Sequence, residues 1–104
     1  MKTTKYHVEI YSKTATADTV TLIYIVISQD APDKQKSIDI LGYIGSLPLG
    51  GDAAKVSEMR NWITSNINST TTKLNQVPNQ FGGITYTLYG TPNIWFLEIG
   101  DPTI

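Results

Sequence analysis

Alternating hydrophobic and polar positions predict two β-strands near the start of the chain. Residues of Lys5–Ser12 alternate at every second position, which is the period of a strand with one buried side. The apolar set is Tyr6, Val8 and Ile10, and the opposite set is His7, Glu9 and Tyr11. Thr19–Ser28 is largely β-branched or aromatic, so we expect a central strand covered on both faces. Polar residues 13–19 separate the two segments, which predicts an antiparallel hairpin.

The pattern then becomes ambiguous. Residues 29–36 contain a proline and mostly charged or amide side chains, which is typical of an exposed loop. In residues 37–49 a strand would line up Ile38, Ile40 and Ile44, whereas a short helix after Pro32 would line up Ile38, Leu41 and Gly45. Two glycines within a helix disfavour it by about 1 kcal/mol each, so we predict a strand here.

A helix is the clearest element of the chain. Asp52 is a good N-cap, and apolar residues recur behind it at three- and four-residue spacing. The stripe consists of Val56, Met59, Ile63 and Ile67. A straight helix continuing to Gln76 would extend about 37 Å, nearly twice the length of a typical strand. We therefore expect a bend, a fray or an overhang near Ser69–Thr72, and Pro78 ends any helix that remains.

The last third predicts two more strands. Residues 84–89 alternate, with Ile84, Tyr86 and Leu88 opposite Thr85, Thr87 and Tyr89. Residues 90–93 form a turn, and residues 93–99 are apolar on both faces except at Glu98, which predicts a covered strand. Residues 100–104 are expected to be a loose tail.

These elements define an α+β fold in a single domain covering residues 1–104. The expected architecture is a small antiparallel sheet of four to five strands with one main helix packed on one face. The expected order is strand, strand, an uncertain third strand, helix, strand, strand. A chain of this length can bury a core without metal or disulfide staples.

Composition narrows the function classes. The chain has no cysteine, which excludes thiolate chemistry and cysteine-based zinc sites, and its formal net charge is −1. That charge gives no overall attraction for nucleic acid. The longest apolar window is too short to span a bilayer, and no signal peptide is apparent. We expect a soluble, cytoplasmic protein (in a host cell if it is viral), with no cofactor, no metal and no membrane association.

Two groups of polar residues could carry chemistry. Gly50, Gly51 and Lys55 surround the expected helix start, where backbone N–H groups can bind an anion, although Asp52 would compete with that anion. His7 and Glu9 share a strand face, and Glu98 joins them if the last strand lies beside the first. A histidine next to carboxylates could act as an acid or base, which leaves a hydrolase or isomerase as one hypothesis.

Aromatic and apolar residues suggest binding surfaces. Aromatic residues on a sheet face could stack bases, but basic residues are nearly absent from the strands, so nucleic acid is disfavoured. Trp62 and Met59 on the helix are candidates for a protein interface, as are Tyr89 and Glu98 on the last two strands.

The sequence therefore predicts a non-enzymatic protein-interaction or assembly protein that forms a homodimer or binds another protein. The alternative is a small-ligand or nucleic-acid binding module that uses the helix start at residues 47–55 or an aromatic sheet face. The composition, high in Thr, Asn, Ile and Tyr and low in Lys and Glu, resembles that of small accessory proteins of viruses or mobile elements.

Overall fold

The computed structural model describes residues 4–11 and 22–100. The elements in chain order are β1 (Thr4–Tyr11), β2 (Leu22–Gln29), α1 (Lys34–Ser46), a 3₁₀ turn η1 (Leu47–Leu49), α2 (Ala53–Ser69), β3 (Leu74–Phe81), β4 (Ile84–Thr91) and β5 (Ile94–Gly100). The predicted turn at residues 13–19 and nearly all of the predicted tail lie outside the described residues.

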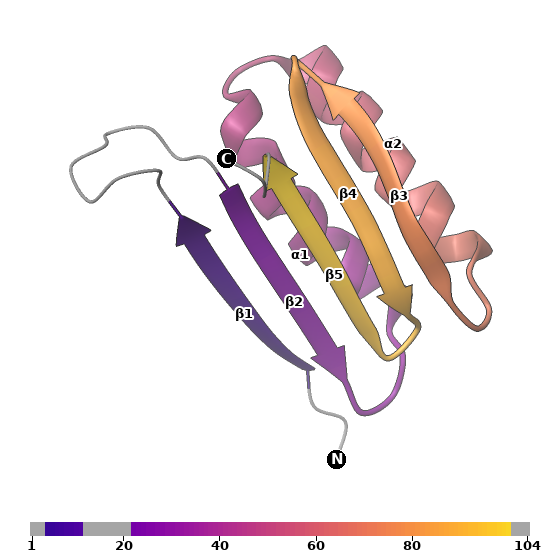
Figure 1. Ribbon diagram of the computed structural model, residues 1–104. Coiled ribbons are helices and arrows are strands. Elements are labelled where there is room, and N and C mark those ends of the chain that lie inside the picture. The colour runs from indigo at the N-terminus through magenta and orange to yellow at the C-terminus, as the bar shows by residue number, and fades with distance from the viewer. Residues whose placement is uncertain (1–3, 12–21, 101–104) are drawn as a thin grey trace.

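The five strands form one sheet in the order β1-β2-β5-β4-β3, and every neighbouring pair is antiparallel. The antiparallel pairing of the first two strands is therefore confirmed. Figure 1 shows both helices on the same side of the sheet, so the molecule has two layers. This confirms the predicted α+β fold with a helix packed on an antiparallel sheet. The helix layer contains two helices rather than the one that we expected.

The core lies between the sheet and the two helices. Every second residue of the central strands points into it, as the alternation in the sequence predicted for residues 84–89. Tyr86 is fully buried, and its hydroxyl donates a hydrogen bond to the Gly45 carbonyl oxygen at 2.6 Å. The largest fully buried side chains are Trp95, Tyr86, Ile25, Ile27, Leu41, Met59, Ile63, Ile67, Leu88 and Leu97.

The strand predicted for residues 37–49 is wrong, because this segment is helix α1 and the turn η1. Asp33 caps α1 by accepting a hydrogen bond from the Lys36 N–H at 3.1 Å. The two glycines that argued against a helix lie where α1 contacts α2. A Cβ on Gly45 would stand 3.0 Å from the Met59 sulfur, and one on Gly42 would stand 3.3 Å from the Arg60 stem. Close packing between the helices therefore offsets the low helix propensity of glycine.

The helix capped by Asp52 spans Ala53–Ser69, so it stops at the start of the segment where we expected a bend, a fray or an overhang, and it does not continue to Gln76. The next element, β3, contains Pro78 and was not predicted from the sequence. Because β3 is an edge strand, Pro78 can occupy it without removing a hydrogen bond from the interior of the sheet. The pairing with β4 is also irregular between Leu74 and Val77.

The expectation that β2 and β5 are covered on both faces needs correction, because Tyr24, Val26 and Ser28 of β2 are half-buried or exposed on the side away from the helices. Trp95, Leu97 and Ile99 are buried under the helices, whereas Ile94, Phe96 and Glu98 on the other side are half-buried. Both helices lie behind the sheet in Figure 1, so neighbouring side chains of the sheet supply the partial cover on that other side. The apolar residues on this second side form a surface.

Candidate interaction surfaces

The sheet face turned away from the helices is named the open face. Strand register places its residues in rows that run across the strands. Its members include Lys5, His7 and Glu9 on β1, Tyr24 and Val26 on β2, Ile94, Phe96 and Glu98 on β5, and Thr87 and Tyr89 on β4. These strands are central in the sheet apart from β1, so the open face has a rigid backbone beneath it.

Three aromatic side chains on adjacent strands, Tyr24, Phe96 and Tyr89, lie across the middle of the open face and are named the aromatic row; Tyr24 is offset diagonally, because it pairs with Glu98 and not with Phe96. The Tyr89 ring stacks on the Phe96 ring with centroids 4.9 Å apart and planes 8° from parallel. The Tyr24 ring lies on the other side of Phe96, at 6.3 Å. Each of the three is half-buried, because the rings shield one another while their outer surfaces stay accessible. Tyr24 was not singled out by the sequence as a surface residue, since its segment is apolar at almost every position.

Glu98 is tied to this aromatic row. The Tyr89 hydroxyl donates a hydrogen bond to the Glu98 Oε1 at 3.1 Å. Burial raises the pKa of Tyr89 well above its ordinary value, and the nearby negative charge of Glu98 and the hydrogen bond to it raise it further. Tyr89 therefore stays neutral and keeps donating at physiological pH.

The expected group of His7, Glu9 and Glu98 is only partly formed. β5 pairs with β2 and not with β1, so the last strand does not lie beside the first. Tyr24 separates the two carboxylates, because it pairs with Glu9 on one side and with Glu98 on the other. His7 Nε2 lies 3.0 Å from Glu9 Oε1 at an exposed position. Among the described residues, no three His, Cys, Asp or Glu side chains are grouped to hold a metal ion.

A second surface, the β1–α1 groove, lies on the helix side of the sheet. It is a hollow of about 360 Å³ lined by Tyr6, Asp39, Ile40, Tyr43 and Ile44. Tyr6 and Tyr43 are each 62 % exposed, and Ile10 farther along β1 is 64 % exposed. Tyr6 and Ile10 point to the same side as the buried residues of β2, but the helix layer does not extend over them. The α1 side of this groove was not predicted from the sequence, because we expected a strand over residues 37–49.

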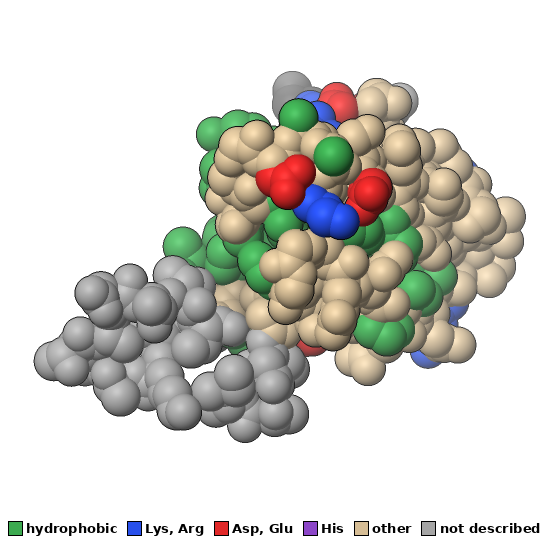
Figure 2. All heavy atoms as spheres, turned by 90° about the horizontal axis from the view of Figure 1, so that it is seen from above, with side chains coloured by type: hydrophobic (Ala, Val, Ile, Leu, Met, Phe, Trp, Pro, Cys, Tyr) green, Lys and Arg blue, Asp and Glu red, His purple; other side chains and the backbone are tan. Residues whose placement is uncertain are grey.

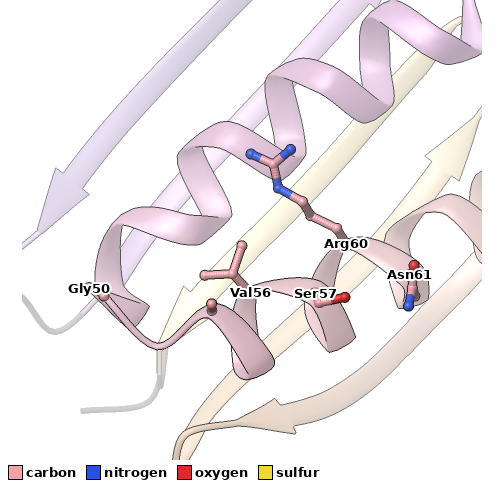
Figure 3. Close-up of a pocket in the computed structure, with 7 residues that line it drawn as sticks. Gly50, Val56, Ser57, Arg60 and Asn61 are labelled. Carbon is pink, nitrogen blue, oxygen red and sulfur yellow. The ribbon is translucent and has the colours of Figure 1, made fainter.

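The start of α2 also borders a hollow, of about 550 Å³, shown in Figure 3. Gly50, Gly51 and Arg60 line it, and the Arg60 side chain extends from α2 toward α1. The Asp52 carboxylate caps this helix by accepting a hydrogen bond from the Lys55 N–H at 3.1 Å. The Lys55 Nζ in turn lies 3.5 Å from the Glu58 Oε2.

This arrangement reduces the positive potential that an anion would meet at the start of α2. Figure 2 views this end of the molecule and shows basic side chains with acidic ones on both sides. The capping carboxylate predicted from the sequence is therefore present, and it occupies one of the N–H groups that an anion would use.

The two helix residues suggested for an interface lie in or beside the core. Met59 is fully buried in the core and lies against Gly45 of α1, so its side chain offers no surface to a partner. Trp62 is half-buried and packs on Phe81 with ring centroids 5.6 Å apart. Part of Trp62 remains accessible at the β3 side of the molecule, so the proposed contact there stays a prediction.

Comparison with known proteins gave no match to a family model, to a curated protein or to a solved structure. Function must therefore be argued from the surfaces themselves. None of the helices in the described part of the chain combines the length and the apolar character needed to cross a membrane.

Proposed function

We propose that this chain is a non-enzymatic protein-interaction module whose open face binds the partner. The observation that carries the proposal is the aromatic row formed by Tyr24, Phe96 and Tyr89 on adjacent strands, turned away from both helices. Aromatic side chains are enriched at protein interfaces because they bury a large area with few rotatable bonds. The strands beneath them hold the rings in place before binding, which lowers the entropy cost of association.

The charges on the open face favour a partner that presents lysine or arginine side chains. Glu9 and Glu98 stand on the two sides of Tyr24 in one row across the strands. A cation placed over an aromatic face is attracted by the ring, and neighbouring carboxylates add to this attraction. Lys5 is the one lysine or arginine among the members named above, and it lies four residues before Glu9 along β1.

The same charges weigh against nucleic acid. The rings could stack bases, but binding a strand also needs lysine and arginine along the path of the phosphates. Next to Tyr24, the carboxylates of Glu9 and Glu98 occupy positions where the phosphates of a bound strand would need lysine or arginine. A protein partner is thus the better fit to the open face.

A titration followed by ¹⁵N NMR tests the proposal. An arginine-rich peptide should shift the amide signals of Tyr24, Tyr89 and Phe96, and the same peptide with glutamate in place of arginine should not. Glu98→Gln keeps an acceptor for Tyr89 but removes the charge, so it should weaken binding up to about fivefold, the effect of an exposed ion pair. Tyr43→Ala, an aromatic truncation on α1, is the control and should leave binding unchanged.

Three results would contradict the proposal. Peptide-induced shifts outside the open face would place the binding site elsewhere, and no shifts with any peptide would remove the proposed partner chemistry. Shifts at the aromatic row with oligothymidylate instead of the peptide would favour the alternative class of nucleic-acid binder.

The second candidate function is a small-ligand module at the start of α2. The hollow beside Gly50, Gly51 and Arg60 favours it, since Arg60 has no carboxylate partner among the described residues. A thermal-shift screen against nucleotides tests it: a rise in the melting temperature that Arg60→Gln abolishes would support this candidate, and a flat response would remove it. The compositional resemblance to viral accessory proteins stays a prediction.

A further inference from the structure

The two edges of the sheet differ in how well they are protected against pairing with another strand. The β3 edge contains Pro78, which lacks an N–H group, and has an irregular register between Leu74 and Val77. β1 pairs with β2 in an unbroken register over all eight of its residues, with neither proline nor bulge. Among the described strands β1 has one neighbour, so its outer backbone groups are a template for a further strand.

Most side chains next to this edge on the helix side are apolar or aromatic, and Asp39 is the charged residue among those that line the β1–α1 groove. Tyr6 and Ile10 of β1 and Tyr43 of α1 are more than half exposed, and the β1–α1 groove lies between β1 and α1. Ile40 and Ile44 line the groove and are themselves only half-buried. A strand added to β1 would lie directly beside this apolar strip and would bring its own side chains over it.

The charges of β1 identify the strand that fits. Lys5, His7 and Glu9 follow one another on the open face, with the base near one end and the acid near the other. Antiparallel pairing of β1 with a second β1, centred on His7, places Lys5 opposite Glu9 of the second copy twice by symmetry. Parallel pairing in register would instead place like charges opposite each other, which is unfavourable.

We propose that two copies of this chain form a twofold dimer by antiparallel pairing of their β1 strands, centred on His7. The two sheets then join into one sheet of ten strands with all four helices on the same side. Adjacent strands lie about 4.8 Å apart, so the two β1 strands leave a gap about 10 Å wide between the helix layers of the two copies. The side chains of Tyr6, Ile10 and Tyr43 from both copies are large enough to fill this gap, which explains why they are exposed in a single copy.

This inference goes beyond the proposed function, because it concerns an edge and a groove rather than the aromatic row. The two are compatible, since a dimer of this kind presents two open faces side by side. They can also fail separately: a monomer could still bind a basic peptide, and a dimer could bind none.

Single cysteines give the sharpest test, because the natural sequence contains none. Residues directly opposite in antiparallel strands have Cα atoms about 4.5–5.5 Å apart, within the range that a disulfide bridges. His7→Cys should therefore form a covalent dimer under mild oxidation. Lys5→Cys on the same strand face should not, because it lies opposite Glu9 and not opposite itself. Ser28→Cys, exposed on the neighbouring strand β2, is the second control.

Charge exchange tests the pairing without oxidation. In sedimentation equilibrium, Lys5→Glu should raise the dimer dissociation constant at least about tenfold, which is a loss of about 1.4 kcal/mol. The double variant Lys5→Glu with Glu9→Lys should bring the constant back toward that of the natural chain. Lys73→Glu, which makes the same charge change just before β3, is the matched control and should have no effect.

A variant on α1, the other element that lines the groove, tests the dimer without any change in β1, so a loss of dimer cannot come from misfolding of β1. Tyr43→Lys changes an exposed side chain of α1, so it should leave the circular dichroism spectrum unchanged and still weaken the dimer at least about tenfold. A monomer at every concentration would overturn the proposal. A dimer that ignores all these substitutions, or one that Lys5→Cys crosslinks as readily as His7→Cys, would overturn it equally.

Discussion

At the scale of single residues, Gly90 is a position where the fold requires the absence of a side chain. Its φ of 143° lies in the region that side-chain-bearing residues rarely adopt, and a Cβ there would stand against the Ile94 carbonyl oxygen and 3.0 Å from the Trp95 Cα. Backbone strain and overpacking each cost about 1–3 kcal/mol. Gly90→Ala should therefore lower the free energy of unfolding by about 3 kcal/mol, measured by urea denaturation.

The control for this prediction is another glycine. Gly51 has no atom within 4 Å of a Cβ built on it, and its φ is not positive. Gly51→Ala should change the free energy of unfolding by less than about 0.5 kcal/mol. Equal effects of the two substitutions would show that the close approach at Gly90 does not constrain the sheet.

Tyr86 makes a prediction about pH. Burial raises the pKa of Tyr86 from its ordinary value of 10.0 to about 12 in the folded protein. The folded state therefore holds this proton more tightly than the unfolded state does. Its contribution to stability is complete below pH 10 and is lost as the pH rises toward 12. Urea midpoints measured from neutral to alkaline pH should fall through this window, and they should fall less steeply for Tyr86→Phe.

The same substitution has a cost at neutral pH. Tyr86→Phe leaves the Gly45 carbonyl oxygen without its hydrogen bond in the core, which costs about 1–3 kcal/mol. Tyr43→Phe removes a hydroxyl from an exposed ring and should change stability little. If the two variants are equally stable, the buried hydrogen bond contributes nothing.

At the scale of elements, α1 depends on its first turn. The Asp33 side chain accepts from the Lys36 N–H, and the Asp33 N–H donates to the Gln29 side chain at the end of β2. Asp33→Ala should cost about 1 kcal/mol of stability and speed amide exchange in the first turn of α1. Asp30→Ala changes an acid nearby whose side chain bonds to no described residue, and it should leave both measurements unaltered. Faster exchange in both variants would contradict the capping role.

How far the sequence predicts each element depends on where its determining contacts lie. The start of α2, the pairing of β1 with β2 and the alternation of β4 are fixed by local patterns, and all were predicted. α1 was misread because what offsets its two glycines is the fit of Gly42 and Gly45 against α2, which no local window contains. β3 was missed because Pro78 argues against a strand unless the strand is known to lie at an edge.

The candidate surfaces, like the elements, could be predicted where they depend on local sequence patterns and not where they depend on the assembled fold. Tyr89 and Glu98 were identified from the period of their strands, and the structure joins them by a hydrogen bond. Tyr24 and Tyr43 were not identified as surface residues, because their exposure depends on how far the helix layer extends across the sheet. That extent is a property of the assembled fold. It leaves an aromatic row on one side of the sheet and an apolar groove on the other.

At the scale of the whole molecule, the sheet is wider than the helices that cover it, and β1 is the strand left over. If a second copy completes the cover, folding and dimer formation are coupled, and stability must depend on protein concentration. A hundredfold rise in concentration should add about 2.7 kcal/mol to the apparent free energy of unfolding per dimer. The urea midpoint of the natural chain should therefore rise with concentration, whereas that of Lys5→Glu should stay constant until the concentration reaches its weaker dissociation constant. Lys73→Glu should follow the natural chain. A midpoint that is independent of concentration for all three proteins would mean that a single copy is stable with Tyr6, Ile10 and Tyr43 in water, and that the apolar strip beside β1 serves another purpose than pairing.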